Sequence, residues 1–381
     1  MNVSASPRPL RCTIQFVMKS PMLRPTLYIP VEKFNNMNDY VRIVQNAPCQ
    51  NVLTLSQNST REPAYDICPT DFSIELSLTG VFDDLMIEMI KITAKRTRTF
   101  PVGPYLANLI YTKDLLPLDR INFNSSSGLP LTIRPISFNS SEKSSMDQVF
   151  FYSGDIFMGS LLSLQMSNST LSAMNLALVT PLYYVAWHWP DFAVMVSQLP
   201  GFLGTNSYQS IPVNSEGTTQ VQNFTAGNYY IIDQDYSAEN SNTLTNFTFD
   251  SNNTKLTIYA GCVVNPFEGL KVVTITNDTV KNFTRVVVKS TCRTYVVEQG
   301  TVSMATTFDN LFYGLSSPAI NGTIGAIMTS LMPTQAENNS FWIKASDGSK
   351  ITVSYDFPLF NNASTDGLTF KVDDGSTQNL M

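Results

Sequence analysis

The chain has 381 residues, of which 43% are hydrophobic and only 14% charged, and its formal net charge is −6 at pH 7. The charged fraction lies well below the ~25% of an average soluble protein, so long exposed helices, which need Glu, Lys and Arg, are not expected. The acidic balance and the absence of a face rich in Lys or Arg exclude nucleic acid as a partner.

Apolar and polar residues alternate with period two in many short runs rich in Val, Ile, Thr and Tyr, and this pattern predicts β-strands. In chain order we expect strands over residues 12–18, 23–31, 40–44, 71–78, 83–93, 105–112, 129–136, 149–154, 176–187, 229–233, 244–249, 255–261, 271–276, 285–289, 294–299, 340–345, 350–355 and 368–372. Residues 310–332 contain the one segment expected to form a helix. The predicted fold class is therefore all-β, with at most one or two short helices.

Short echoes at an offset of ~120 residues, the usual size of one domain, indicate related modules in tandem. We expect equivalent positions for Phe100 and Phe224, for Leu131 and Leu256, and for Asp71 and Asp191, the last pair each followed by Phe. The predicted domains are a β module lacking its first strand at 1–95, β-sandwich modules at 96–205 and 206–310, and a β-rich segment at 311–381. A partial fourth module is one interpretation of that last segment.

The densest basic run, Lys91, Lys95, Arg96 and Arg98, lies between the first two predicted modules. It reads as a solvated linker or as a charged edge that prevents strands of different molecules from pairing. A processing site at Lys95-Arg96 is the alternative interpretation.

The five cysteines contain no CxxC pair, which argues against a zinc ribbon or a thioredoxin-type motif. In an oxidising compartment we expect disulfides between Cys49 and Cys68 and between Cys262 and Cys292, with Cys12 left over.

Acceptor sequences for N-linked glycans are dense, which indicates passage through a secretory compartment. We expect glycosylation among Asn58, Asn124, Asn139, Asn168, Asn223, Asn246, Asn252, Asn277, Asn282, Asn321, Asn338 and Asn362; a further sequon begins at Asn2. Residues 1–20 show no secretory signal, and no apolar stretch reaches the ~20 residues of a membrane-spanning helix. We therefore expect an extracellular protein whose start, with its signal peptide, is missing from this sequence.

Three segments resemble the nematode CUB-like domain proteins: PAYDICPTDFSIELS (63–77), FTAGNYY (224–230) and LTIYAGCVVNPFEG (256–269). The resemblance implies tandem antiparallel β-sandwiches, an extracellular setting, no enzymatic activity, and a role in innate immunity or the stress response. The chain departs from the family in its odd cysteine and absent signal peptide. The calcium-binding acids of true CUB domains cannot be placed either, since Asp83 and Asp84 read as a solvated loop.

Catalytic chemistry has few candidates, because His188 is the one histidine and no GxSxG, phosphate-binding loop or dinucleotide motif is present. No cofactor or metal is expected. Trp187, His188, Trp189 and Asp191 form a candidate binding patch for an extracellular protein or a carbohydrate, with closure of a core by the tryptophans as the alternative. The expected function is a secreted, non-catalytic binding or structural protein. The alternative is a secreted, glycosidase-like hydrolase, which would need two facing carboxyl groups ~5–9.5 Å apart.

Overall fold

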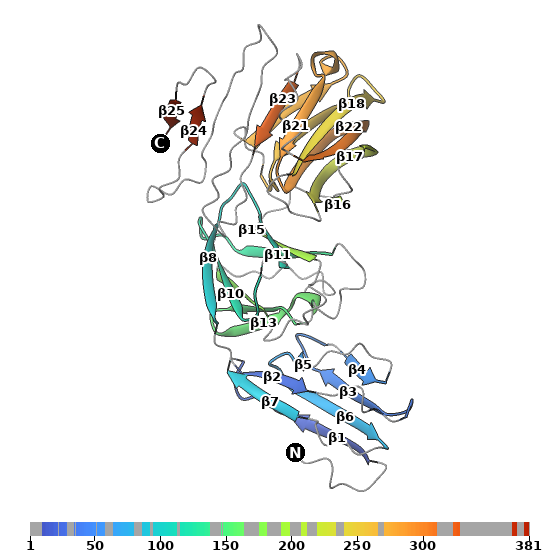
Figure 1. The fold of residues 1–381 in the computed structure, drawn as a ribbon, viewed down its shortest axis with the longest axis vertical. Helices are drawn as coiled ribbons and strands as arrows, with labels where there is room; N and C mark the ends of the chain where they lie inside the picture. The colour runs from blue at the N-terminus through green and yellow to red at the C-terminus, as the bar shows by residue number, and fades with distance from the viewer. Residues whose placement is uncertain are drawn as a thin grey trace.

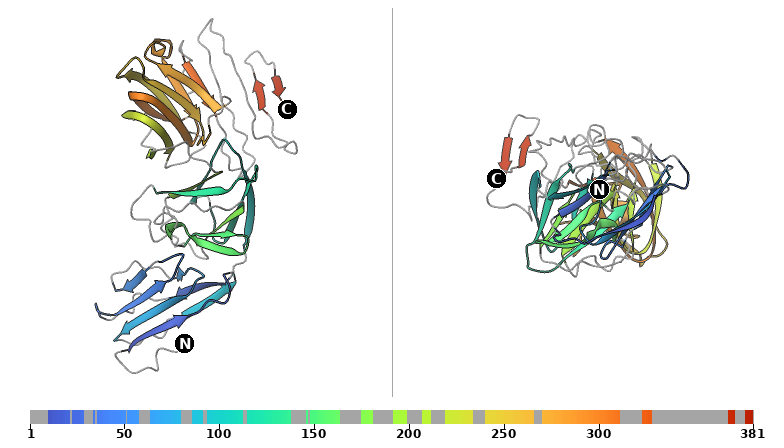
Figure 2. Two further views of the ribbon diagram at one scale, coloured as in Figure 1. Left: turned by 180° about the vertical axis from the view of Figure 1, so that it is seen from behind. Right: turned by 90° about the horizontal axis from the view of Figure 1, so that it is seen from below.

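The structure of the chain is a computed structural model. The described residues are 10–21, 23–28, 34, 36–50, 52–57, 64–79, 86–91, 94–112, 115–137, 146, 148–163, 175–180, 192–198, 207–211, 219–233, 240–265, 270–310, 323–327, 368–371 and 377–380. All but residues 368–371 and 377–380 belong to three β modules that follow one another along the long axis of the molecule (Figure 1). The view from behind shows the same order (Figure 2). The predicted all-β fold built from β-sandwiches is confirmed.

The first module consists of a four-stranded and a three-stranded sheet. Its strands are β1 (Leu10–Phe16), β2 (Leu23–Tyr28), β3 (Tyr40–Gln45), β4 (Val52–Ser56), β5 (Ala64–Asp66), β6 (Phe72–Leu78) and β7 (Met86–Lys91). Sheet A has the order β1-β6-β3-β4 and sheet B the order β5-β2-β7. In β6, Phe72, Ile74, Leu76 and Leu78 point into the core, as the alternation predicts.

The outer face of sheet A is mostly polar, with Val44 and Val52 as its apolar members. Three rows of cross-strand neighbours run over it, Arg11, Ser77, Tyr40 and Ser56, then Thr13, Glu75, Arg42 and Thr54, then Gln15, Ser73, Val44 and Val52. An exposed ion pair joins Arg42 to Glu75 at 3.2 Å. This face therefore suits contact with water.

The second module consists of a five-stranded and a three-stranded sheet. Its strands are β8 (Arg96–Val102), β9 (Asn108–Tyr111), β10 (Asp119–Ser125), β11 (Leu131–Ser137), β12 (Phe150–Ser153), β13 (Ile156–Ser160), β14 (Asn175–Val179) and β15 (Phe192–Gln198). Sheet C has the order β13-β12-β14-β10-β8 and sheet D the order β11-β15-β9. Phe151, Leu178 and Val194 are among the buried side chains that fill the space between them.

The third module is built on two long strands. Its elements are β16 (Ser207–Ile211), β17 (Thr219–Asp233), β18 (Asn240–Phe249), β19 (Lys255–Ala260), β20 (Lys271–Thr276), the 3-10 helix η4 (Val280–Asn282), β21 (Arg285–Lys289), β22 (Cys292–Asn310) and β23 (Thr323–Ile327). β17 pairs with β22 from Thr219↔Thr307 to Ile232↔Cys292, with an irregularity between Thr225 and Gly227. One half of this pair continues into β18, β21 and β23, and the other half into β16, β19 and β20. The two long strands thus pass from one layer of the sandwich to the other.

The same strand order recurs in all three modules. Counted without β7, β8, β16 and β23, which lie outside the roll, the last strand lies between the first and the third, as β6 lies between β1 and β3, β15 between β9 and β11, and the end of β22 between the start of β17 and β18. The second strand pairs with the next-to-last, as β2 with β5, β10 with β14, and the end of β17 with the start of β22. This order in two packed sheets is that of a jelly roll.

The echoes in the sequence agree with this topology only in part. Phe72 and Phe192 open the corresponding strands β6 and β15, while Asp191 lies outside the described residues. The predicted equivalence of Phe100 and Phe224 is wrong, because Phe100 lies on β8, an edge strand that precedes the roll and pairs in parallel with β10. In the third module that place belongs to β16, which pairs in parallel with β17. Phe100 and Phe224 are both buried, but they lie on strands that are not equivalent in the two modules.

Two further expectations differ from the structure. Leu131 lies on β11, the third strand of its roll, whereas Leu256 lies on β19, the fourth, so their equivalence is wrong as well. The segment expected to be helical contains β23, which pairs in parallel with β21. In the remaining part of 311–381 that the structure describes, β24 (Leu368–Lys371) and β25 (Thr377–Leu380) pair with each other.

Strands β12, β14 and β15 are buried on both faces, not on one. In β15 every residue from Phe192 to Gln198 is buried. Phe192, Val194 and Val196 face the core of the second module, whereas Ala193 and Met195 pack against the third module. Such strands show continuous apolar runs in place of strict alternation.

Gly300 should tolerate no side chain. It has a φ of +63°, and a Cβ there would collide with Asp250 and Thr254. Gly154 has a similar φ of +61° but open space around it. We expect Gly154→Ala to cost about 1–2 kcal/mol from backbone strain and Gly300→Ala to cost roughly 1–3 kcal/mol more from the collision. Denaturant unfolding of both variants checks this, and equal losses would contradict it.

Candidate functional site: the interfaces between modules

The first interface joins sheet B of the first module to the outer face of sheet C. Phe150, Tyr152, Ala177 and Val179 of the second module form a buried apolar cluster with the disulfide Cys49–Cys68 of the first. Neighbouring residues on β12 therefore pack in different places: Phe151 packs in the core of the second module, and Phe150 packs in the interface with the first module. The Tyr152 hydroxyl donates to the Pro21 carbonyl at 3.3 Å.

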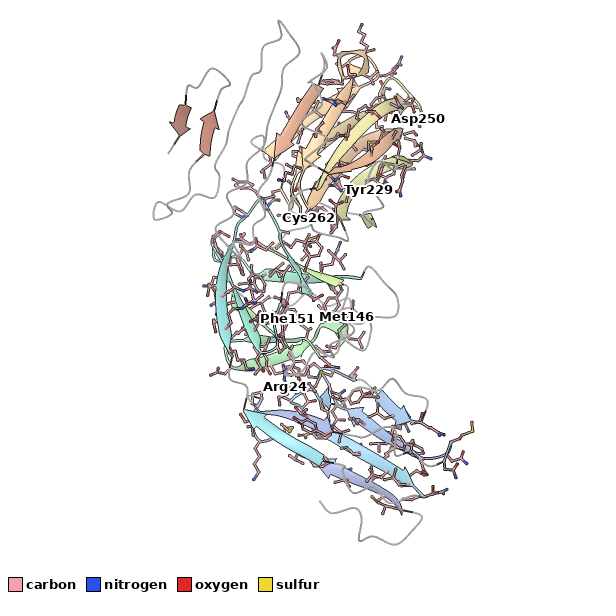
Figure 3. All side chains as sticks on the ribbon, viewed as in Figure 1. Arg24, Met146, Phe151, Tyr229, Asp250 and Cys262 are labelled. Atoms are coloured by element: carbon pink, nitrogen blue, oxygen red, sulfur yellow. A yellow bond between two sulfur atoms is a disulfide. The ribbon has the colours of Figure 1, made fainter. Side chains whose placement is uncertain are left out.

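A buried arginine stands at the centre of this interface. Arg24 on β2 is 1% exposed, and its Nη1 donates to Asp66 at 2.9 Å and to the carbonyl of Thr180 at 2.9 Å, so one side chain links both modules. Its guanidinium carbon lies 4.2 Å from the ring centroid of Phe150, within the range of cation–π attraction. Figure 3 labels Arg24 at the junction. Desolvation of the charge is offset only while every partner is in place.

The second interface includes main-chain hydrogen bonds between the second and third modules. Leu106 and Val263 form an antiparallel bridge, Ala107 N donates to Cys262 O at 2.9 Å, and Val264 N donates to Tyr105 O at 2.8 Å. Around these bonds an apolar cluster combines Leu109, Tyr111, Ile136, Ala193 and Met195 with Tyr230, Ile232, Val264 and the Cys262–Cys292 disulfide. Two short segments from different modules are therefore joined by an isolated β-bridge.

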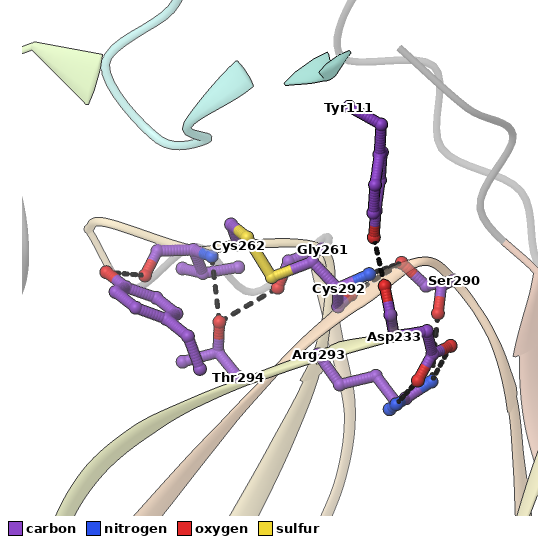
Figure 4. The surroundings of a disulfide bond; sticks show 10 residues. Tyr111, Asp233, Gly261, Cys262, Ser290, Cys292, Arg293 and Thr294 are labelled. Carbon is purple, nitrogen blue, oxygen red and sulfur yellow. Dashed lines mark hydrogen bonds and ion pairs between the residues drawn. A yellow bond between two sulfur atoms is a disulfide. The ribbon is translucent and has the colours of Figure 1, made fainter. Parts of the chain in front are cut away.

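A second buried ion pair lies directly behind this interface (Figure 4). Arg293 contacts both carboxylate oxygens of Asp233, one of them at 3.0 Å, and also donates to Ser290 O at 2.9 Å. The hydroxyl of Tyr111, from the second module, donates to the carbonyl of Asp233 at 2.6 Å. Thr294 donates to Gly261 O and accepts from the amide of Val263, each at 2.8 Å, which holds the bridging segment in place.

Both predicted disulfides are confirmed, and each lies at an interface. The Cα atoms are 6.6 Å apart for Cys49–Cys68 and 5.3 Å apart for Cys262–Cys292, inside the usual range of about 4.4–6.8 Å. Cys12, on β1, is half-buried and is in no disulfide. The sequence predicted the pairs but not their location between modules.

The basic run is part of a folded edge. Arg96 and Arg98 lie on β8, the edge strand of sheet C, and both contact the buried Asp119. Asp119 also accepts from the amide of Leu116 at 2.9 Å. Arg96 at the predicted processing site is thus held in a strand by an ion pair, which agrees with the charged-edge interpretation.

Other sequence-based sites fall partly outside the described residues. The patch of Trp187, His188, Trp189 and Asp191 lies outside them, as do Asn58, Asn139, Asn168, Asn321, Asn338 and Asn362. The asparagines Asn124, Asn223, Asn246, Asn252, Asn277 and Asn282 are exposed. Within the described ranges no cluster of three His, Cys, Asp or Glu side chains could hold a metal ion, and no helix is long and apolar enough to cross a membrane.

Sequence reasoning missed the buried charges. Arg24 stands between Leu23 and Pro25 in β2, Asp233 follows the apolar end of β17, and Arg293 follows the buried Cys292 at the start of β22. A charge at an inward position of such a strand was the available signal, since it requires a partner of opposite charge.

No family model and no curated protein matches the chain. Among solved structures, a chain of Sulfolobus Turreted Icosahedral Virus has a TM-score of 0.20 and 10% identity, covering 81% of this chain and 84% of that one. A chain from a structure described as the triple jelly roll fold and turret assembly in an archaeal virus has a TM-score of 0.20 and 10% identity, covering 85% and 86%. Similarity at this level carries no argument about function.

Arg24→Ala should destabilise the protein far more than the loss of an exposed arginine. It leaves Asp66 buried without its cation, for which we expect a loss of about 3–5 kcal/mol in the free energy of unfolding. Arg42→Ala, which breaks the exposed pair with Glu75, should cost about 0–1 kcal/mol. Denaturant unfolding of both variants tests this, and comparable losses would show that Arg24 contributes no more than a surface residue.

Alkaline pH should weaken the first interface through Tyr152. Burial raises the pKa of Tyr152 from 10.0 to about 12. Between these values the unfolded chain loses the proton that the folded chain keeps, so stability is intact below pH 10 and falls by about 2 kcal/mol by pH 12. The Tyr152→Phe variant should lack this part of the fall in stability between pH 10 and pH 12. Tyr105→Phe, at a tyrosine that is 42% exposed, serves as the control, and identical pH profiles for all three proteins would contradict the assignment.

Proposed function

We propose that this chain is an extracellular, non-catalytic structural protein, a rigid rod that holds surfaces for binding at a fixed separation. The single observation that carries the proposal is the pair of buried interfaces that joins the three modules. Modules on a flexible linker would keep exposed polar faces between them and move independently.

The chemistry of the interfaces supports rigidity. Each contains a disulfide, an apolar cluster and a neighbouring buried Arg–Asp pair. An angular change at the first interface would separate Arg24 from Thr180, and one at the second would break the bridge between Leu106 and Val263. Both changes leave buried polar groups without partners, which is costly.

The buried acids support a non-catalytic role. In the described part of the chain the buried carboxyl groups belong to Asp39, Asp66, Asp119 and Asp233. Asp39 accepts from the amide and hydroxyl of Thr79, and the other three pair with arginines. These acids therefore have structural partners, in contrast to the facing carboxyl pair that a glycosidase needs.

The compartment is inferred from the cysteines. Two disulfides persist most readily in an oxidising environment such as the cell exterior. Binding partners of an extracellular rod would be other proteins or carbohydrates. The loops of a β-sandwich can vary for such contacts without disturbing the sheets.

Spin-label distances test the rigidity. In a Cys12→Ser background, labels at Val17→Cys with Ile156→Cys span the first interface, and labels at Ile156→Cys with Val221→Cys span the second. These side chains are 76%, 67% and 73% exposed, so labelling should not disturb the core. We expect a single narrow distance distribution for each pair by double electron–electron resonance.

A pair within one module provides the control. Labels at Val17→Cys and Met37→Cys both lie in the first module and report the width due to the labels alone. Inter-module widths equal to this control support the rod. Broad or multiple distributions across either interface would rule out a rigid rod.

A further inference from the structure

We infer that the third module carries N-linked glycans on Asn223, Asn246, Asn252, Asn277 and Asn282. Glycosylation shares the extracellular setting of the proposed function but does not depend on the rigidity of the rod. The argument rests on exposure, on the residues that surround each asparagine, and on the position of the set in the fold.

All five acceptor asparagines are exposed, whereas asparagines outside acceptor sequences are not uniformly so. Among the described asparagines outside acceptor sequences, Asn108 and Asn242 are buried, Asn122, Asn228 and Asn265 are half-buried, and Asn36, Asn38, Asn46, Asn175 and Asn253 are exposed. An asparagine in a strand or turn reaches water only where the local structure turns it outward. The third module does this at each of the five positions.

The structural reason is clearest where phenylalanine is the middle residue. Asn223, Asn246 and Asn282 are each followed by Phe and then Thr. Phe224 and Phe247 are buried in the core of the module, and Phe283 packs against it. On β17, neighbours point to opposite faces, so the anchored Phe224 directs Asn223 and Thr225 outward. On β18 the pairing with β22 is irregular between Thr245 and Thr248, and this irregularity, with a φ of +54° at Asn246, leaves Asn246 exposed beside the buried Phe247.

The other two asparagines lie in turns that meet. Asn252 lies in the turn after β18, and Asn277 lies in the turn after β20. The side-chain Nδ2 of Asn277 donates to the side-chain Oδ1 of Asn252 at 2.6 Å. Turns suit bulky modification because the backbone there is already at the surface. Figure 3 shows neighbouring Asp250 at the end of the module away from Cys262, and hence away from the second interface.

Acceptor type sets this module apart. All five sequences have threonine in the third position, at Thr225, Thr248, Thr254, Thr279 and Thr284. Asn124, the described acceptor on the second module, has Ser126 there and lies on sheet C. Threonine is the better acceptor residue, so the acceptor sequence favours the third module over Asn124, which is exposed as well.

Mass spectrometry of the full chain, purified from the cells that naturally produce it, tests the inference. Peptides that contain the five asparagines should carry an added hexose-containing mass, with fragment ions that place it on asparagine. Peptides of native mass at all five positions would overturn the inference.

A matched pair of variants locates one site. Asn252→Gln destroys its acceptor sequence, whereas Asn253→Gln, at an exposed neighbour, leaves it intact. Produced in the same cells, Asn252→Gln should lose one glycan from the intact mass while Asn253→Gln loses none, with both melting like the parent protein. Equal masses of glycan on both variants would overturn the assignment at Asn252. Narrow inter-module distances in a chain without glycans would leave the rod standing while the glycan inference fails.

Discussion

The stacked arrangement depends on the second module, in which strands β12, β14 and β15 are buried on both faces. Phe150 and Phe151, adjacent on β12, point into an interface and a core respectively, and Ala193 and Val194 do the same on β15. Such strands cannot face water on either side, so the second module is stable in this form only with both neighbours in contact. The buried Arg24 and the bridge at Leu106 then fix the orientation that apolar contact alone leaves free.

Features set by local patterns could be predicted from the sequence. The alternation in β6 indicated its buried face, and the spacing of four cysteines indicated both disulfides. The strand expected over residues 83–93 is present as β7. In each case the information lies within a few neighbouring residues, or in the chemistry of a residue type with few partners to choose from.

Features set by contacts between distant parts of the chain could not be predicted from the sequence. Nothing near Arg24 specifies that it meets Thr180, and nothing near Phe100 shows that β8 pairs in parallel with β10 ahead of the roll. The segment TIGAI lies in the stretch expected to be helical, yet its β-branched Thr and Ile and its Gly disfavour a helix, and it pairs as β23 with β21. Parallel pairing joins segments far apart in the chain, so the partner of β23 could not be identified from its own residues.

The polar outer face of sheet A has a consequence for self-association. Sheets B, C and D each offer an apolar face to a neighbouring module, and a further copy with such a face could add to the stack without limit, as in fibre growth. Sheet A instead presents Thr13, Glu75 and Arg42 in one row. Covering these groups with another apolar sheet would strip them of water, so this face disfavours the addition of a further copy through an apolar contact.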